Sequence, residues 1–178
     1  LASALLLTAA APPSPLPLLV LGALAPAALA IPRGTPLLAA RSGALLFAVH
    51  WGLLLLWIPQ AGARVGVWTV AAWLALVLTL ALLGALFGAL LHRLVAAGTH
   101  LSVALALAWM TVEVGRGTLL GPLDFPWMGV AVPLTAHPPL IQGAAWVGEV
   151  GLGTGIMLVN GAVAEALRHA TVRRSRAS

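Results

Sequence analysis

The chain has 178 residues, of which 61% are hydrophobic and only 7% charged, and its mean hydropathy is +1.06. Soluble domains carry about 25% charged residues, so this composition excludes a water-soluble globular fold. Lipid offers the backbone no hydrogen-bond partners, so only helices or a closed barrel can span a membrane. The apolar runs do not alternate with polar residues, which favours helices. We therefore predict an all-α, polytopic membrane helix bundle with about six hydrophobic segments.

The nine basic residues are all arginine, and the chain contains no cysteine. The pI of about 11.9 does not indicate nucleic-acid binding, because the arginines stand at the ends of apolar segments, where they anchor topology. Membrane lipids are the expected partners of these arginines. Without cysteine the chain has no disulfide, thiolate nucleophile or cysteine-based metal site, and no other metal-ligand pattern is seen.

The first half of the chain contains four apolar segments. Residues 1–11 are too short to span alone, and the proline cluster that follows breaks the helix. No basic region precedes this segment, as it would in a signal peptide, so we interpret the segment as what remains of a first span. The next segments are 16–31, 43–58 and the long run 66–91.

Two further apolar segments follow, at 94–114 and 138–167. Between them, residues 115–137 are rich in proline and glycine, which predicts an interfacial or re-entrant outer loop buried against the bundle. The sequence thus predicts one transmembrane domain over residues 1–167. Residues 168–178 are predicted to be a basic cytoplasmic tail.

The arginines also predict an orientation. If every segment crosses once, seven of them fall on one side, and only Arg64 and Arg116 fall on the other. The positive-inside rule makes the seven-arginine side cytoplasmic, which places both termini inside and the 115–137 loop outside. The seven are Arg33, Arg41, Arg93, Arg168, Arg173, Arg174 and Arg176.

A few charged and amide side chains interrupt the apolar segments. Glu113 and Arg116 are three residues apart, which favours an ion pair at a helix end over a role in substrate binding. Asp124 in the outer loop is expected to cap a turn or to pair with Arg116. Glu149 and Asn160 share one helical face, so an intramembrane carboxylate and amide are candidates for function there.

His50 and His100 fall within predicted spans, where an imidazole can ligate haem or chlorophyll. Neither has a second histidine one helical turn away, so we expect hydrogen-bonded packing and no cofactor. Two small-xxx-small pairs are candidate helix-packing sites, although glycine is frequent enough here for such pairs to arise by chance. They are Gly84 with Gly88, and Gly151 with Gly155.

Two motifs resemble those of one enzyme family. Residues 109–117 (WMTVEVGRG) and the following Phe125, Pro126 and Trp127 are similar to the helix end and loop of apolipoprotein N-acyltransferases. The glycine-rich stretch 148–153, with Asn160 downstream, is similar to the family's next helix. The resemblance extends over nearly the whole chain, but Asp124 stands where the family has glycine.

The resemblance implies a bacterial inner-membrane protein and acyl transfer from phospholipid to a lipoprotein, through a thioester on a cysteine. In the family, that cysteine works with Glu and Lys in a nitrilase-like domain after the spans. This chain has neither cysteine nor lysine, so these residues cannot run the reaction alone. We expect a non-catalytic accessory subunit, packed on other membrane subunits, for example in a respiratory or photosynthetic complex. The alternatives are the membrane portion of a full acyltransferase and, last, a small transporter or pigment-binding subunit.

Overall fold

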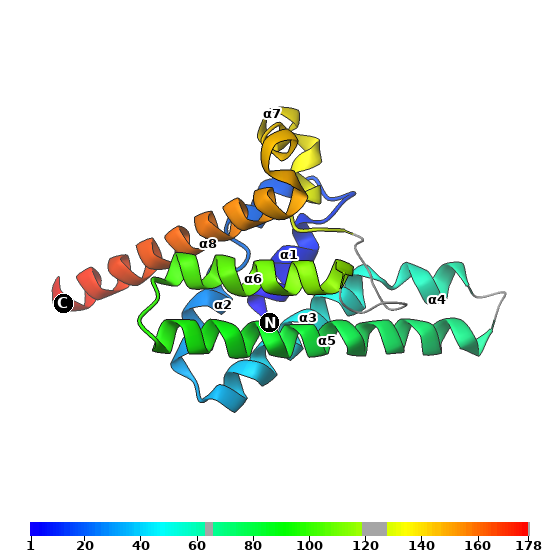
Figure 1. Cartoon of the computed structure of the whole chain (residues 1–178), viewed down its shortest axis with the longest axis horizontal. Helices are drawn as coiled ribbons and strands as arrows, with labels where there is room; N and C mark the ends of the chain where they lie inside the picture. Colours follow the sequence, from blue (N-terminus) through cyan, green and yellow to red (C-terminus); the bar gives the residue numbers. More distant parts are fainter. Residues whose placement is uncertain (63–65, 119–127, 178) are drawn as a thin grey trace.

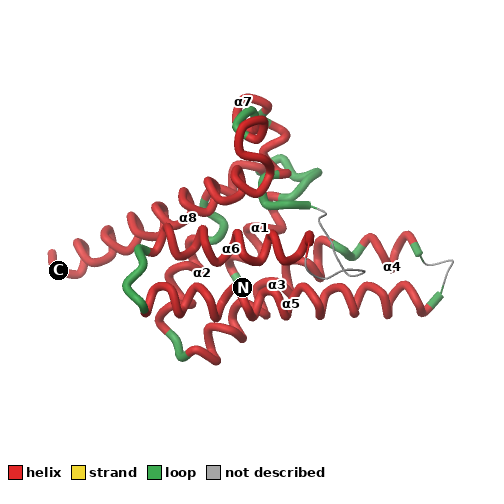
Figure 2. The backbone as a smooth tube through the Cα atoms, viewed as in Figure 1, coloured by secondary structure: helices red, strands yellow, loops and turns green. Residues whose placement is uncertain are grey.

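The computed structural model describes residues 1–62, 66–118 and 128–177, and these residues form helices and turns without a strand (Figure 1, Figure 2). The predicted all-α class is confirmed. Three stretches are long and apolar enough to cross a membrane. They are Pro36–Ala61, Val67–Ala96 and Ala144–Arg173.

The first of these stretches contains α3 (Pro36–Leu54) and the short α4 (Trp57–Ala61). The helix begins seven residues before the predicted start at residue 43. Thr35 caps it by accepting a hydrogen bond from the Leu38 backbone N–H at 3.3 Å, and Pro36 occupies the first turn, where no N–H is needed.

Helix α5 (Val67–Ala96) runs antiparallel to α3, and α6 (Leu101–Thr118) returns beside it (Figure 1). The turn between them uses Gly98 at a φ of +88°. The predicted span 66–91 corresponds to α5. The predicted span 94–114 begins in the last turn of α5 and falls mostly in α6, which is not among the three stretches long and apolar enough to cross a membrane. Helix α6 continues through residues 115–118, which the sequence had placed in the loop, so the loop begins later than predicted.

The N-terminal region is more broken than predicted. After α1 (Ala2–Ala10) the chain forms η1 (Pro17–Leu21), α2 (Ala25–Ala30) and η2 (Ile31–Arg33). The segment 16–31 is thus a series of short helices instead of one span. The breaks are stabilised by side chains from elsewhere, because Ser3 accepts a hydrogen bond from the Ala27 N–H at 2.9 Å.

The C-terminal region contains η4 (Val132–Ala136), α7 (Pro138–Ile141) and α8 (Ala144–Ala177). The predicted span 138–167 is therefore a short turn followed by a long helix, with a break at Gly148, where φ is +70°. Helix α8 continues without interruption into the basic stretch from residue 168. Residues 129–131 before η4 are buried against the bundle, whereas residues 119–127 of the predicted loop lie outside the described part of the chain.

Small residues set the closest helix contacts. A Cβ on Gly88 of α5 would overlap the Ala39 carbonyl oxygen of α3, and a Cβ on Gly84 would lie 2.5 Å from the Gly43 carbonyl oxygen. Helices α6 and α8 approach in the same way, because a Cβ on Gly161 would overlap the Ser102 Cα. A Cβ on Gly155, by contrast, would have no neighbour within 4 Å.

An aromatic cluster joins three helices in the core. The ring of Phe47 on α3 lies 5.9 Å from Phe87 on α5 and 5.6 Å from Trp109 on α6, measured between centroids. Phe87 and Trp109 meet edge to face at 5.7 Å. Such tilted contacts are the favoured geometry for aromatic pairs. They fix α6 against the α3–α5 pair, and so fix the polar end of α6 described next.

Candidate functional site

The end of α6 carries an ion pair inside the bundle. Arg116 Nη2 donates to Glu113 Oε1, and the two side chains are only 4% and 10% exposed. The guanidinium also lies over the Trp51 ring, 5.2 Å from its centroid, so α3 supplies a cation–π contact. A charge at this burial is costly unless it is paired, and the three groups satisfy one another.

A second carboxylate lies next to this pair. A Cβ on Gly129 would overlap Glu149 Oε1 and would lie 3.2 Å from Glu113 Oε1, so both carboxylates converge on this glycine. Glu149 stands directly after the Gly148 break in α8, which turns it toward the segment before η4. Two carboxylates, from α6 and α8, thus meet at this backbone position, and Glu113 also binds Arg116. Only a glycine at position 129 lets the backbone pass this closely.

Four further predicted site residues lie outside the described part of the chain. They are Asp124, Phe125, Pro126 and Trp127. The expected pairing of Asp124 with Arg116 therefore stays a prediction.

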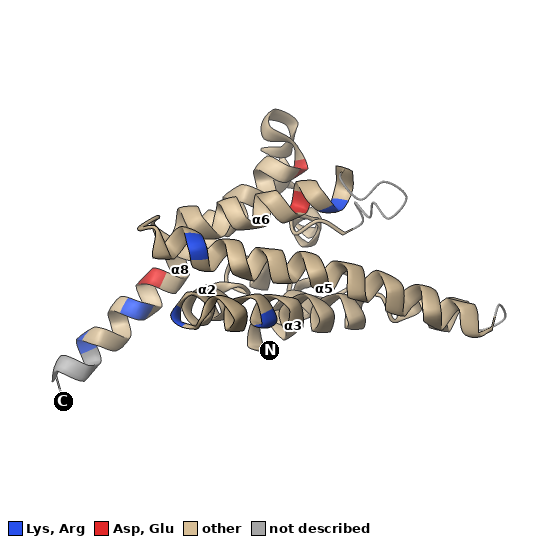
Figure 3. Cartoon of the chain, turned by 60° about the horizontal axis from the view of Figure 1, so that its bottom comes forward, with Lys and Arg blue, Asp and Glu red and all other residues tan. Residues whose placement is uncertain are grey.

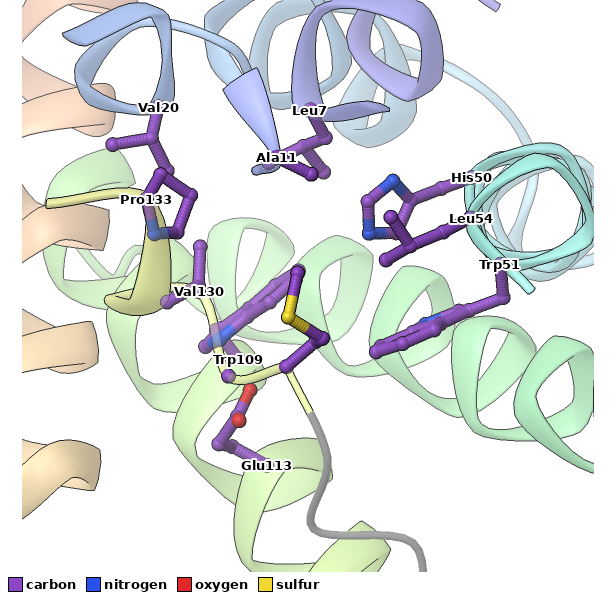
Figure 4. A pocket seen from close by; sticks show the side chains of 12 residues that line it. Leu7, Ala11, Val20, His50, Trp51, Leu54, Trp109, Glu113, Val130 and Pro133 are labelled. Atoms are coloured by element: carbon purple, nitrogen blue, oxygen red, sulfur yellow. The ribbon is translucent and has the colours of Figure 1, made fainter. Parts of the chain in front are cut away.

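A small cavity lies beside the ion pair, where α1, α3, α6 and the segment before η4 meet (Figure 4). It leaves about 30 Å³ for the centre of a water molecule, which is room for one or two waters. Most of its wall is apolar. The lining residues are Leu7, Ala11, Val20, His50, Trp51, Leu54, Trp109, Glu113, Met128, Gly129, Val130 and Pro133.

Two buried polar side chains face this cavity. His50 Nδ1 lies 3.0 Å from Thr8 Oγ1, whose own proton goes to the Ala4 carbonyl at 2.8 Å. Thr8 can therefore only accept from the ring, so Nδ1 carries the proton and Nε2 is a free acceptor on the cavity side. Trp109 Nε1, a donor, is buried and has no partner among the described residues. A water molecule between these groups would satisfy both.

The two predicted histidines have different surroundings. His50 lines the small cavity described above. His100 precedes α6 at the opposite end of that helix, with 67% of its side chain exposed, and its Nε2 lies 3.1 Å from Glu165 Oε1. His100 therefore lies in the α5–α6 turn and not within a span, because α6 begins only at Leu101, after the turn at Gly98.

Asn160 is not part of this cluster, although it shares α8 with Glu149. It is fully buried and bonds to the backbone of the broken N-terminal segment, so its role is structural. Sequence reasoning missed Thr8 and Trp51 as members of the site. No local pattern marks them, because α1 and α3 reach the end of α6 only through the tertiary fold.

The family model of the apolipoprotein N-acyltransferase N-terminal domain matches residues 3–162. The chain belongs to this family. No curated protein and no solved structure matches the chain. The match includes the ion pair, Glu149, the cavity and the glycine contacts, so the whole cluster lies within the family's membrane domain. It ends before the basic end of α8.

Membership in this family confirms the resemblance seen in the motifs of α6. The chain is a membrane domain related to apolipoprotein N-acyltransferase, and its apolar helices associate with lipid. Along Pro36–Ala61, Trp51 lies ten residues from Arg41 and ten from Ala61, about 15 Å each way at the helical rise. The ion pair on Trp51 is therefore well inside the apolar length of the bundle.

Proposed function

We propose that this chain is the non-catalytic membrane component of a lipoprotein N-acyltransferase system in a bacterial inner membrane. The family match over residues 3–162 carries the proposal. The thiolate that forms the thioester has to come from outside these 178 residues, from the same polypeptide or from a second one, because the chain has no cysteine.

The polar cluster gives this component a mechanical role. Glu113 pairs with Arg116 and also faces Gly129, so one carboxylate links α6 to the segment before η4. The η4 helix that follows this segment packs on η1 and carries the buried Pro133 and Leu134. In the proposed role, the ion pair keeps this surface rigid where a catalytic domain or subunit docks. Ionisable groups inside the apolar length of a bundle mark function more often than packing.

The orientation we propose places both termini in the cytoplasm. The described arginines of η2, α3, α5 and α8 gather toward one end of the bundle, whereas the charged residues at the end of α6 and the start of α8 lie away from that end (Figure 3). The positive-inside rule assigns the arginine-rich end to the cytoplasm. The Glu113 cluster then faces the side on which lipoproteins are acylated.

The decisive experiment depletes this chain in its own host and measures the acylation of a lipoprotein. Mass spectrometry of the N-terminal lipopeptide should show the loss of one acyl chain. Wild-type chain should restore it, and Glu113→Gln should restore it less than Glu165→Gln, a matched change at the other end of the bundle.

Purification in mild detergent tests the accessory-subunit alternative. The proposal expects a cysteine-containing nitrilase-like segment, either on the same polypeptide or bound to it. Unchanged lipoprotein acylation, together with respiratory or photosynthetic subunits at fixed stoichiometry, would overturn the proposal in favour of a subunit of another complex. Transport or pigment binding has no specific observation behind it.

A further inference from the structure

A second cavity lies at the arginine-rich end of the bundle, far from the Glu113 cluster along α6. Its volume is about 180 Å³, and it is formed by α2, η2, the end of α5, the start of α6 and α8. Two arginines and five apolar residues line it. They are Ala28, Leu29, Pro32, Arg33, Val95, Leu101 and Arg168.

The two arginines come from helices far apart in the sequence. Arg33 ends η2 and Arg168 lies in the last third of α8, and the fold brings both to one cavity. Both are exposed, and neither has an ion-pair partner in the described part of the chain. Glu165, three residues before Arg168, is the acid closest in sequence, but its carboxylate contacts His100.

The charge balance of this end favours an anion. The described arginines here are Arg33, Arg41, Arg93, Arg168 and Arg173, and Glu165 is the only described acid among them. Planar guanidinium groups suit phosphate, because each presents a fork of donors to its oxygens. Two guanidinium groups that line one cavity can therefore both donate to a single phosphate.

The apolar part of the cavity wall favours an anion that carries an acyl chain over a free anion. Leu29, Val95 and Leu101 would be a poor surface for a free, fully hydrated anion, but they suit the first carbons of an acyl chain. We propose that this cavity binds the phosphate headgroup of an anionic phospholipid. Basic pockets between membrane helices are a known type of headgroup site. The site is independent of any role in acyl transfer.

The test compares two double variants that remove the same charge. Arg33→Gln with Arg168→Gln removes both arginines of the cavity. Arg41→Gln with Arg173→Gln removes two exposed arginines from the same end that do not line it. Each purified protein is titrated with phosphatidylglycerol in phosphatidylcholine nanodiscs, and bound lipid is counted by native mass spectrometry.

A direct hydrogen bond to a charged group contributes about 1.5 kcal/mol, so the loss of two guanidinium–phosphate contacts should weaken phosphatidylglycerol binding roughly 150-fold. The control variant should stay within about threefold of wild type, because screened surface charges act weakly. Equal losses of phosphatidylglycerol affinity in both variants would mean that diffuse surface charge attracts the lipid, and would overturn the proposed site. So would equal binding of phosphatidylcholine, or displacement of the lipid by an equal concentration of inorganic phosphate. Gel filtration and circular dichroism check that each variant is folded.

Discussion

The backbone N–H of Leu24 donates to Asn160 Oδ1 at 2.7 Å, a hydrogen bond between residues 136 positions apart. Asn160 Nδ2 donates in turn to the carbonyls of Val20 at 2.8 Å and Ile156 at 2.9 Å. The chain between η1 and α2 is not helical enough to satisfy its own backbone groups. One amide side chain on α8 supplies a donor and an acceptor, which is what makes a broken segment tolerable inside a membrane.

Replacing Asn160 by leucine should therefore destabilise the protein. The Leu24 N–H and the Val20 carbonyl would both lose a buried partner, and the expected cost is about 2 kcal/mol of unfolding free energy. Reversible unfolding in mixed detergent and SDS micelles, followed by circular dichroism, measures it. Gln142→Leu is the control, because that exposed amide makes only a 3.3 Å bond to the Pro138 carbonyl. Equal stability of the two variants would show that Asn160 does not hold the segment.

Much of the fold follows from local sequence, and the misses have a physical cause. The long run in α5 is visible as hydropathy alone. The early start of α3 was also readable, because Thr35 and Pro36 form an N-cap and a first-turn proline. The break of 16–31 was not readable, because the side chains that satisfy it come from α1 and α8. The apolar composition of this segment predicts one continuous span, because its length allows one.

In the candidate site, too, local contacts were predictable from the sequence and contacts between distant segments were not. The Glu113–Arg116 pair was predictable, since both residues lie three apart on one helix. The approach of Glu149 was not, because it depends on the Gly148 break and on the absence of a side chain at Gly129. Sequence spacing along α8 grouped Glu149 with Asn160 instead. In the structure these two side chains have different partners: Glu149 reaches Gly129, whereas Asn160 binds the backbone of Val20 and Leu24.

The glycine contact between α3 and α5 predicts an asymmetry between two similar substitutions. Gly88→Ala would place a methyl group on the Ala39 carbonyl oxygen, so the helices would have to separate, at a cost of about 2 kcal/mol. Gly155→Ala meets open space and should stabilise α8 by about 0.5 kcal/mol through helix propensity. Melting temperatures in one detergent compare them. A neutral Gly88→Ala would mean that the helices do not need this close approach.

The cavity beside His50 predicts that the purified chain is colourless. Its volume of about 30 Å³ leaves no room for a porphyrin or chlorin ring beside Nε2, the ring nitrogen that Thr8 does not bind. An absorption spectrum from 350 to 700 nm of protein purified from its host membrane should show no band, and His50→Leu should leave the spectrum unchanged. A Soret band lost in His50→Leu would show that the region opens around a pigment.

The ion pair of α6 predicts a non-additive response to mutation. Glu113→Leu alone leaves the guanidinium of Arg116 buried without its carboxylate, and we expect about 3 kcal/mol of destabilisation, with a similar cost for Arg116→Met alone. The double variant replaces both charges by apolar groups of comparable size and should lose less than either single variant. Unfolding in SDS mixtures gives the four free energies of this cycle.

Glu149→Gln is the matched control for that cycle, because it removes a carboxylate that also faces Gly129 but belongs to an exposed residue. Glu149 makes no ion pair with another described residue, so stability should change by less than about 1 kcal/mol. Strictly additive losses at positions 113 and 116 would mean that each side chain is held by other partners. In that case the pair would not be what fixes the segment before η4 to α6.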